Sequence, residues 1–319
     1  MKPDLIFLQE ALAATAALQA ADRLGVFERL SDGPVSAASL VRDCGIANRG
    51  AELLLAAMSG IGLLEKNGAG SYRKSVPDLG TLRLLAHHFD HLTEAIRDDQ
   101  PVAAGDTPAG AESLYPQAVD HLASLFSEAA KRVADHLAKP GLQILEAGSG
   151  AAPWSLAIAS RCPDCRVTAV DLPAVLPVTR RAVQAAGRQT QYRYIAGDFF
   201  QTELGSSAYD LAIAGGICHL FDEGANCVLL ARLFRTLRPG GRLAIIDALP
   251  NENLDGPRSV VLYALGLLLR SRHGRVYPFS AYAGWLRDAG FEAIDRSDVD
   301  LVPAVSLITA RRPPHDKGG

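Results

Sequence analysis

Glycine and acidic residues recur at the ends of apolar runs in the C-terminal half of the chain. Gly148 and Gly150 follow the run 142–146, and Asp171 directly follows the next run, 166–170. Glycine permits a tight turn and a close approach of the backbone to a ligand. An acid at the end of a second strand accepts hydrogen bonds from ribose hydroxyls. The spacing therefore predicts a nucleoside-binding site.

The pattern departs from a dinucleotide fingerprint at Pro153, where a third glycine is expected. Proline instead suits the first turn of a helix. The ligand that fits is a nucleoside without a pyrophosphate, such as S-adenosylmethionine, whose carboxylate would use exposed helix N–H groups. A Gly-Asp-Phe sequence at 197–199, after the third strand, strengthens this interpretation.

His219 follows a fourth apolar run, 209–214, and is the candidate for chemistry. A phenolic hydroxyl has a pKa of about 10 and must lose its proton to accept a methyl group. Histidine can take that proton near neutral pH. Asp247 ends the next strand and would orient the imidazole. The alternative is a histidine that only caps backbone at a strand end.

Apolar runs of strand length alternate with amphipathic helical patterns after Pro140-Gly141. This alternation predicts an α/β fold with a parallel, doubly wound, Rossmann-like sheet. Ligands of such sheets lie beyond the carboxyl ends of the strands. The expected strands are 142–146, 166–170, 209–214, 242–247, 293–295 and 305–309.

The N-terminal region reads as three helices and a hairpin. A first helix over 4–30 carries an apolar stripe of Leu5, Leu8, Leu12 and Ala16, and Ser36 opens a second. The third helix, about 48–59, is expected to bury Leu53, Leu54 and Met58. Two short strands around the glycine-rich turn at 67–70 complete a winged-helix arrangement.

The winged helix is more easily explained as a protein–protein module than as a DNA reader. Its third helix offers Arg49 as the one phosphate contact, followed by Glu52, whereas phosphate binding needs several cations on one face. The net charge is −3 and the pI about 6.2, where a general nucleic-acid or membrane-surface binder would be basic. A transcriptional regulator that senses a small molecule is the less favoured reading.

A length of 319 residues predicts about two domains. We expect a winged-helix dimerisation domain over 1–85, a helical linker and acceptor-pocket region over 86–140, and the cofactor-binding domain over 141–319. One helical stripe is expected to run from Leu122 to Leu137. The histidines of this region, His87, His88, His91 and His121, are read as surface or core groups.

The sequence is typical of a protein of the reducing cytoplasm. Its five cysteines form no disulfide framework, and the pair Cys162 and Cys165 is expected in a surface loop without a metal. The longest uncharged apolar run, 259–269, is shorter than the roughly 20 residues that span a bilayer. This run predicts a buried helix that either lines an acceptor pocket or belongs to the core or a dimer interface.

Several segments resemble those of the small-molecule O-methyltransferases of the plant caffeate and bacterial polyketide type: EAGSG at 146–150, DLP at 171–173, GDFF at 197–200, His219 and RPGG at 238–241. The resemblance covers about residues 7–310. It implies a homodimer that transfers a methyl group from S-adenosylmethionine to a hydroxyl of a small acceptor, with His219 as general base. The residues that it implies for the cofactor are Glu146, Gly148, Gly150, Asp171, Leu172, Asp198 and Phe199.

One departure from the family keeps alternatives open. The family often has a second acid shortly after a Gly-Lys pair, where this chain has Val276. A relative that catalyses hydroxylation, decarboxylation or a pericyclic step remains an alternative, as does metal-assisted C-methylation of a 2-oxo acid by His219, Asp247 and His273. The acceptor and the choice of O-, N- or C-methylation stay open. The candidate pocket aromatics, each expected more often in the core, are Trp154, Trp285, Phe221 and Tyr263.

Overall fold

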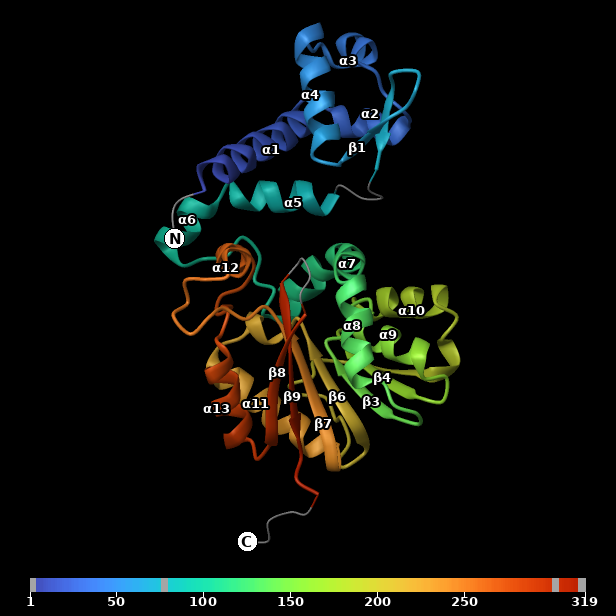
Figure 1. Ribbon diagram of the computed structural model, residues 1–319, viewed down its shortest axis with the longest axis vertical. Helices are drawn as coiled ribbons and strands as arrows, with labels where there is room; N and C mark the ends of the chain where they lie inside the picture. The colour runs from blue at the N-terminus through green and yellow to red at the C-terminus, as the bar shows by residue number, and fades with distance from the viewer. Residues whose placement is uncertain (1–3, 76–79, 300–303, 315–319) are drawn as a thin grey trace. The chain divides into compact units, whose positions relative to one another are not determined.

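The computed structural model describes residues 4–75, 80–299 and 304–314 (Figure 1). The chain divides into two compact units, Met1–His91 and Leu92–Gly319. This boundary lies before the one expected near Pro140-Gly141, because α8 (Ser127–Leu137) packs its buried face into the core of the sheet unit. The finer division at residues 85 and 140 stays a prediction.

The first unit has the expected winged-helix order of helices followed by a hairpin. β1 and β2 pair antiparallel, and Val35 forms an isolated bridge to Tyr72. A single apolar cluster fills the unit around Leu40, Leu55 and Met58. The elements are α1 (Leu5–Arg23), α2 (Val26–Asp32), α3 (Ala37–Cys44), α4 (Asn48–Gly60), β1 (Leu64–Lys66), β2 (Tyr72–Lys74) and α5 (Gly80–Phe89).

The helix expected over 4–30 is in fact two helices. Gly25 has φ +72°, a left-handed conformation that ends the run after α1 and starts α2. The apolar stripe of α1 also does not enter the core of its unit: Leu5, Leu8 and Leu12 are exposed, Leu12 by 73%. Ala21 is the fully buried residue of α1.

The third helix of the winged helix buries a different face from the expected one. Ala51, Leu55 and Met58 of α4 are buried, whereas Leu53 is 59% exposed and Leu54 half-buried. Of the expected set, Met58 is buried, Leu54 packs partly buried against the same core, and Leu53 was wrong. Adjacent leucines at 53–55 point in directions about 100° apart on a helix, so the tertiary contacts alone choose among them.

The second unit is a seven-stranded sheet between helices. Its strand order is β5-β4-β3-β6-β7-β9-β8, and β5, β4, β3, β6 and β7 are all parallel. The strands are β3 (Gln143–Ala147), β4 (Arg166–Asp171), β5 (Tyr192–Ala196), β6 (Tyr209–Gly215), β7 (Leu237–Asp247), β8 (Glu292–Val299) and β9 (Val305–Arg311). The helices are α6 (Leu92–Asp98), α7 (Pro108–Leu125), α8, α9 (Pro153–Arg161), α10 (Leu176–Ala185), η1 (Gln189–Gln191), η2 (Cys218–Leu220), α11 (Glu223–Thr236), α12 (Arg258–Arg270) and α13 (Phe279–Asp288).

The expectation of a wholly parallel sheet is wrong at one edge. β9 runs antiparallel to both β7 and β8. β8 ends at Val299 and β9 begins at Val305, and strands joined by so short a connection pair antiparallel, whereas a parallel pair needs a crossover of a dozen or more residues. The five parallel strands that carry the predicted site residues are as expected.

Both faces of the sheet are covered, as Figure 1 shows. Leu145 of β3 packs with the residues of α11 and α13, and its neighbour Ile144 packs with those of α8 and α9. Adjacent strand residues face opposite sides, so a run of apolar residues indicates a strand covered on both faces. The winding reverses at β3, which lies between β4 and β6. This is where a doubly wound sheet binds its ligand.

Three further expectations need correction. The stripe expected from Leu122 to Leu137 is interrupted, because α7 ends at Leu125 and α8 begins at Ser127. The run 259–269 forms α12, but Leu262 and Leu265 on it are exposed. Cys162 and Cys165 are buried in the core, not in a surface loop, and the five cysteines are free. Within the described ranges no helix has both the length and the apolarity to cross a membrane.

Candidate active site

The turn after β3 requires glycine. Gly148 has φ +67° and Gly150 φ +51°. A Cβ on Gly148 would lie 2.7 Å from Cγ2 of Ile217, which follows β6. The Gly148 amide donates to the carbonyl of Val170 at 2.9 Å, so the turn folds over the end of β4. The turn is therefore tight, as the spacing predicted.

Asp171 stands at the end of β4 with its carboxylate against this turn. Oδ2 accepts from the Gly150 amide at 2.7 Å, and Oδ1 from the Leu172 amide at 2.8 Å. Burial raises the pKa of Asp171 to about 6, and the two amide hydrogen bonds oppose that rise. Each carboxylate oxygen keeps further acceptor capacity, so the group can still bind ribose hydroxyls.

The end of β5 brings Asp198 and Phe199 to the same edge. Asp198 Oδ1 accepts from the Phe200 amide at 2.8 Å, which fixes the turn. Phe199 Cε1 lies 3.6 Å from where a Cβ of Gly148 would be. The Phe199 ring also packs against Phe221 at 6.0 Å between centroids. The segments after β3 and β5 thus meet, as the predicted cofactor set requires.

Glu146 lies one layer deeper, in β3, and is buried. Its Oε2 accepts from the Ser155 hydroxyl, which also contacts Tyr192 Oη at 2.8 Å, while Oε1 has no hydrogen-bond partner among the described residues. Burial raises the pKa of Glu146 to about 8. The orphaned Oε1 is a polar atom that a bound ligand or a water would satisfy.

His219 and Asp247 meet at the ends of β6 and β7. Nδ1 of His219 lies 2.6 Å from Oδ1 of Asp247, and both residues are buried. The His219 amide donates to Asp247 Oδ2 at 3.1 Å, and Tyr282 Oη donates to Oδ2 at 3.3 Å. A carboxylate on Nδ1 places the proton there, which leaves Nε2 as the basic nitrogen. Tyr263 Oη lies 2.8 Å from Nε2, at hydrogen-bond distance.

The structure does not assemble the metal set that the sequence left open. No group of three or more potential His, Cys, Asp or Glu ligands exists among the described residues. His273 is exposed, while the neighbouring backbone reaches the base: the Arg275 amide donates to the His219 carbonyl at 2.9 Å. Asp247 is therefore the acidic residue that contacts His219. Val276 has no carboxylate to offer.

Of the candidate pocket aromatics, Tyr263 is the one that contacts His219. Trp154 and Trp285 are buried in the two cores of the sheet unit. Phe221 packs against Phe199 and Phe200. Sequence reasoning missed Arg270, which lies over the Tyr263 ring at 4.6 Å. The spacing of seven residues, two helical turns, was the available signal.

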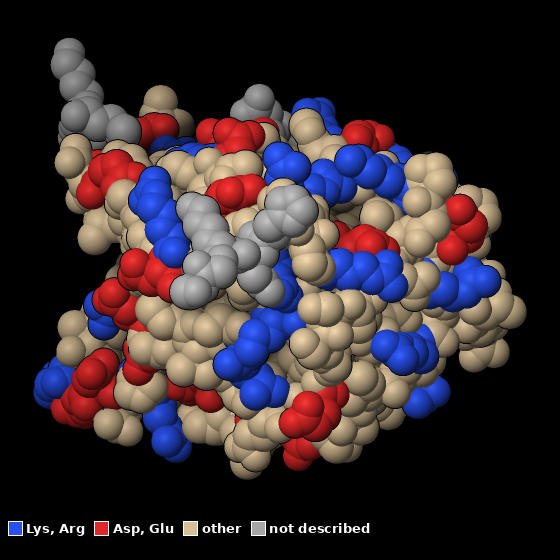
Figure 2. All heavy atoms as spheres, turned by 90° about the horizontal axis from the view of Figure 1, so that it is seen from below, with Lys and Arg blue, Asp and Glu red and all other residues tan. Residues whose placement is uncertain are grey.

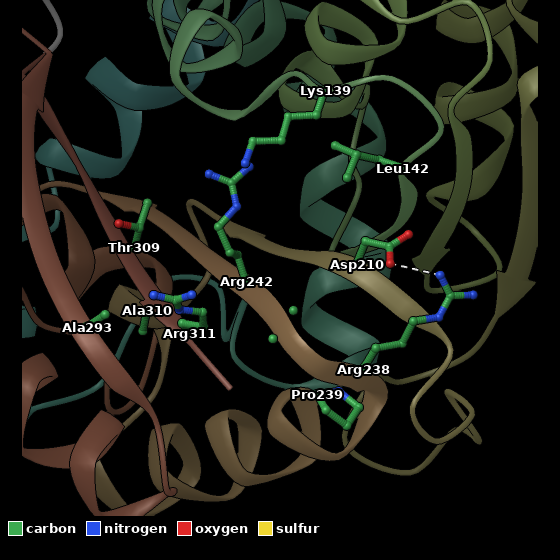
Figure 3. Close-up of a pocket in the computed structure, with 12 residues that line it drawn as sticks. Lys139, Leu142, Asp210, Arg238, Pro239, Arg242, Ala293, Thr309, Ala310 and Arg311 are labelled. Atoms are coloured by element: carbon green, nitrogen blue, oxygen red, sulfur yellow. Dashed lines mark hydrogen bonds and ion pairs between the residues drawn. The ribbon is translucent and has the colours of Figure 1, made fainter. Parts of the chain in front are cut away.

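A separate pocket of about 550 Å³ lies at the opposite edge of the sheet, where the parallel strands begin (Figure 3). Lys139, Arg242 and Arg311 line it, together with Arg238, whose guanidinium pairs with Asp210 at 2.8 Å. Figure 2 shows acidic and basic side chains interspersed over the face seen from below. The pocket shares no residue with the predicted cofactor set.

Comparison with known proteins agrees with this geometry. Residues 102–292 match the O-methyltransferase domain, and residues 7–76 match the O-methyltransferase dimerisation domain. This chain belongs to the O-methyltransferase family. It is 31% identical over 304 residues to 3-hydroxy-5-methyl-1-naphthoate 3-O-methyltransferase of Streptomyces sahachiroi, covering 89% of this chain and 87% of the relative.

Two other proteins extend the comparison. The chain is 28% identical over 310 residues to the tetracenomycin polyketide synthesis 8-O-methyl transferase TcmO of Streptomyces glaucescens, covering 90% of this chain and 91% of the relative. The fold matches that of human N-acetylserotonin methyltransferase in complex with SAM, with a TM-score of 0.75 at 24% identity, over 98% of this chain and 99% of that one. The resemblance, the fold class and the cofactor inferred from sequence are confirmed.

The protein is an S-adenosylmethionine-dependent O-methyltransferase. Its residues fit that cofactor: a turn that excludes a Cβ at Gly148, the start of α9 at Pro153, which no side chain caps, and the buried carboxylate of Asp171 at the strand edge. Pro153 occupies the first turn of α9, as expected of a fold without a dinucleotide. When bound, S-adenosylmethionine supplies an electrophilic methyl group on a sulfonium centre.

Proposed function

We propose that this O-methyltransferase methylates a phenolic hydroxyl of a small aromatic, polyketide-like metabolite, with His219 as general base. The contact between Tyr263 Oη and His219 Nε2, at 2.8 Å, carries the proposal. Tyr263 is itself a phenol, and its hydroxyl lies at His219 Nε2 in the position that the hydroxyl of a phenolic acceptor would take. Relatives named for a naphthoate and for tetracenomycin support an acceptor of this class.

The base works through its buried carboxylate partner. An acceptor hydroxyl in place of Tyr263 Oη donates to His219 Nε2, and the proton moves to that nitrogen as the phenolate forms. The imidazolium that results lies 2.6 Å from Asp247, which stabilises its charge and holds the ring. Phenols have a pKa of about 10, so a positioned base is needed to remove the phenolic proton at neutral pH.

The cofactor side of the site is assigned to residues at the ends of three strands, β3, β4 and β5. Gly148 and Gly150 let the backbone approach the ligand, and Asp171 accepts from ribose hydroxyls through the capacity left on Oδ1 and Oδ2. The roles of Glu146, Leu172, Asp198 and Phe199 in cofactor binding belong to the same proposal. We infer that Leu172 acts through its backbone amide, which positions the Asp171 carboxylate.

We infer a homodimer formed through the dimerisation domain at 7–76, because an exposed leucine stripe on α1 needs cover. The acceptor is a small molecule. No nucleic-acid or membrane partner is proposed, since α4 offers Arg49 beside Glu52 and little further positive charge. Five free cysteines support a reducing, cytoplasmic location. A role in secondary metabolism, such as antibiotic biosynthesis, fits relatives of this kind.

The test is methyl transfer itself. The purified protein is incubated with S-adenosylmethionine and a panel of naphthols and hydroxynaphthoates, and products are identified by mass spectrometry. The expected result is a mass gain of one methylene on a phenolic oxygen. His219→Asn should abolish it while calorimetry with S-adenosylhomocysteine shows unchanged cofactor binding. Cofactor binding with turnover of an acceptor but no methyl transfer would favour the non-methylating alternative that Val276 left open.

A further inference from the structure

Two residues of α12 extend the site beyond the base. Tyr263 and Arg270 lie two turns apart on one face of this helix, and the Arg270 guanidinium carbon is 4.6 Å from the centroid of the Tyr263 ring. The same tyrosine places its hydroxyl on His219 Nε2. Arg270 therefore lies about one ring's width from the point where the acceptor hydroxyl meets the base.

The positive charge of Arg270 has no anionic partner in the described parts of the chain. Another half-buried arginine has one: Arg296 pairs with Asp298 at 2.7 Å. Arg232 is satisfied differently, by donating to the carbonyls of Phe199 and Thr202. Arg270 makes neither an ion pair nor a hydrogen bond to a carbonyl within residues 4–75, 80–299 and 304–314. A guanidinium in this setting is a ready partner for a planar carboxylate.

Tyr115 of α7 adds a donor next to Arg270. Its Oη is buried and has no hydrogen-bond partner among the described residues. A Cβ on Gly105 would lie 3.1 Å from that Oη and 2.8 Å from the Arg270 carbonyl, so Gly105 brings the two residues together. Burial raises the pKa of Tyr115, and Arg270 is the strongest opposing influence, which again places the two groups close together.

We propose that Arg270 and Tyr115 form a subsite for a carboxylate on the acceptor, next to the hydroxyl that is methylated. The acceptor class is then an aromatic ortho-hydroxy carboxylate, and this identification rests on the proposed methylation of a phenol at His219. The aromatic ring of the acceptor occupies the space around Tyr263 Oη. To reach Arg270, the carboxylate of the acceptor must therefore be on the same ring as the reacting hydroxyl. A carboxylate farther along a larger scaffold would miss the guanidinium.

The subsite also serves the proton transfer. In an ortho-hydroxy carboxylate the phenolic O–H donates a hydrogen bond to the neighbouring carboxylate, and this bond raises the pKa of the phenol because it favours the neutral form. Arg270 and Tyr115 engage that carboxylate with their own donors. The phenolic O–H is then released to donate to His219 Nε2, where the base removes the proton.

A matched pair of ligands tests the proposal. 3-Hydroxy-2-naphthoate and 2-naphthol differ by the carboxylate alone, and their binding is measured by calorimetry with S-adenosylhomocysteine present. The full-length protein should bind the naphthoate at least about tenfold more tightly, as expected for a charged bidentate contact. Arg270→Met should remove that preference, Arg270→Lys should retain part of it, and Tyr115→Phe should reduce it. Arg272→Met, an exposed neighbour, should change nothing.

Two results would overturn the subsite: equal binding of both ligands by the unmodified protein, or an equal loss for both ligands in Arg270→Met. The latter would make Arg270 a structural partner of Tyr263. Methyl transfer is scored separately by mass spectrometry. A carboxylate preference without methyl transfer would refute the proposed function and leave the subsite standing, whereas methylation of 2-naphthol in preference to the naphthoate would do the reverse.

Discussion

Asp247 Oδ1 lies 2.6 Å from His219 Nδ1, in a part of the sheet unit where both side chains are buried. Asp247 also accepts from the His219 amide through Oδ2, so the residue holds both the ring and the backbone of the base. The other ring nitrogen, Nε2, is left to contact an oxygen atom, and in this structure that atom is Tyr263 Oη.

Asp247→Asn should lower kcat by about 10²–10⁴, because the amide cannot enforce the tautomer with a basic Nε2 or stabilise the imidazolium. The dissociation constant of S-adenosylhomocysteine should stay the same. Steady-state kinetics and calorimetry measure the two quantities. Asp288→Asn, on the exposed side of α13, is the matched control. Unchanged kcat in Asp247→Asn would show that the carboxylate has no part in the proton transfer.

Tyr263→Phe should lower the KM of the acceptor by a few fold and leave kcat within about threefold. The reason is that the Tyr263 hydroxyl competes with the acceptor hydroxyl for His219 Nε2. The phenylalanine keeps the ring over which Arg270 lies. Initial rates over a range of acceptor concentrations separate the two constants. A fall in kcat above tenfold would instead mean that Tyr263 passes the proton to His219.

Cofactor binding should weaken in acid through Asp171. Its pKa is raised to about 6, so the carboxylate that accepts from ribose hydroxyls is present above that pH and lost below it. The dissociation constant of S-adenosylhomocysteine should rise about tenfold between about pH 7 and pH 5. Asp171→Asn should bind more weakly and lose this pH dependence. The same slope in the variant would assign the effect to another group.

Glu146→Gln should stabilise the protein in alkaline solution relative to the unmodified chain. Burial raises the pKa of Glu146 from 4.5 to about 8, so its contribution to stability is present below 4.5 and is lost as the pH rises towards 8. The uncharged glutamine has no such loss. Urea unfolding at about pH 5 and pH 8 should show the variant gaining on the order of 1 kcal/mol or more over this range. Glu203→Gln, at an exposed position, should gain nothing.

The exposed stripe of α1 should carry part of the dimer contact. Replacing Leu8 and Leu12 together by glutamate introduces two charges into a face that we infer to be covered by a second copy. Sedimentation should then show a monomer. Val228→Glu, at an exposed apolar position of α11, should remain a dimer. A dimer in the double variant would place the interface elsewhere on the dimerisation domain.

Some features were fixed by chemistry local to the chain and were predictable for that reason. Gly148 and Gly150 mark a tight turn with positive φ, which disfavours any side chain, and Pro153 suits the first turn of the helix that follows. Asp171 and His219 follow apolar runs directly, and the carboxyl ends of parallel strands meet at one edge. The fold class and the edge that carries the site follow from these residues alone.

Other features depend on contacts between residues distant in the sequence, which single-chain patterns do not contain. Leu53 and Leu55 are equally apolar, and only the packing of α4 decides that Leu55 is buried. The antiparallel placement of β9 depends on its pairing with both β7 and β8. The grouping of Tyr115 and Arg270 beside the base joins α7 to α12. Sequence determined the cofactor and predicted the base; tertiary structure decided which groups contact His219, because burial and charge pairing arise only once the elements pack.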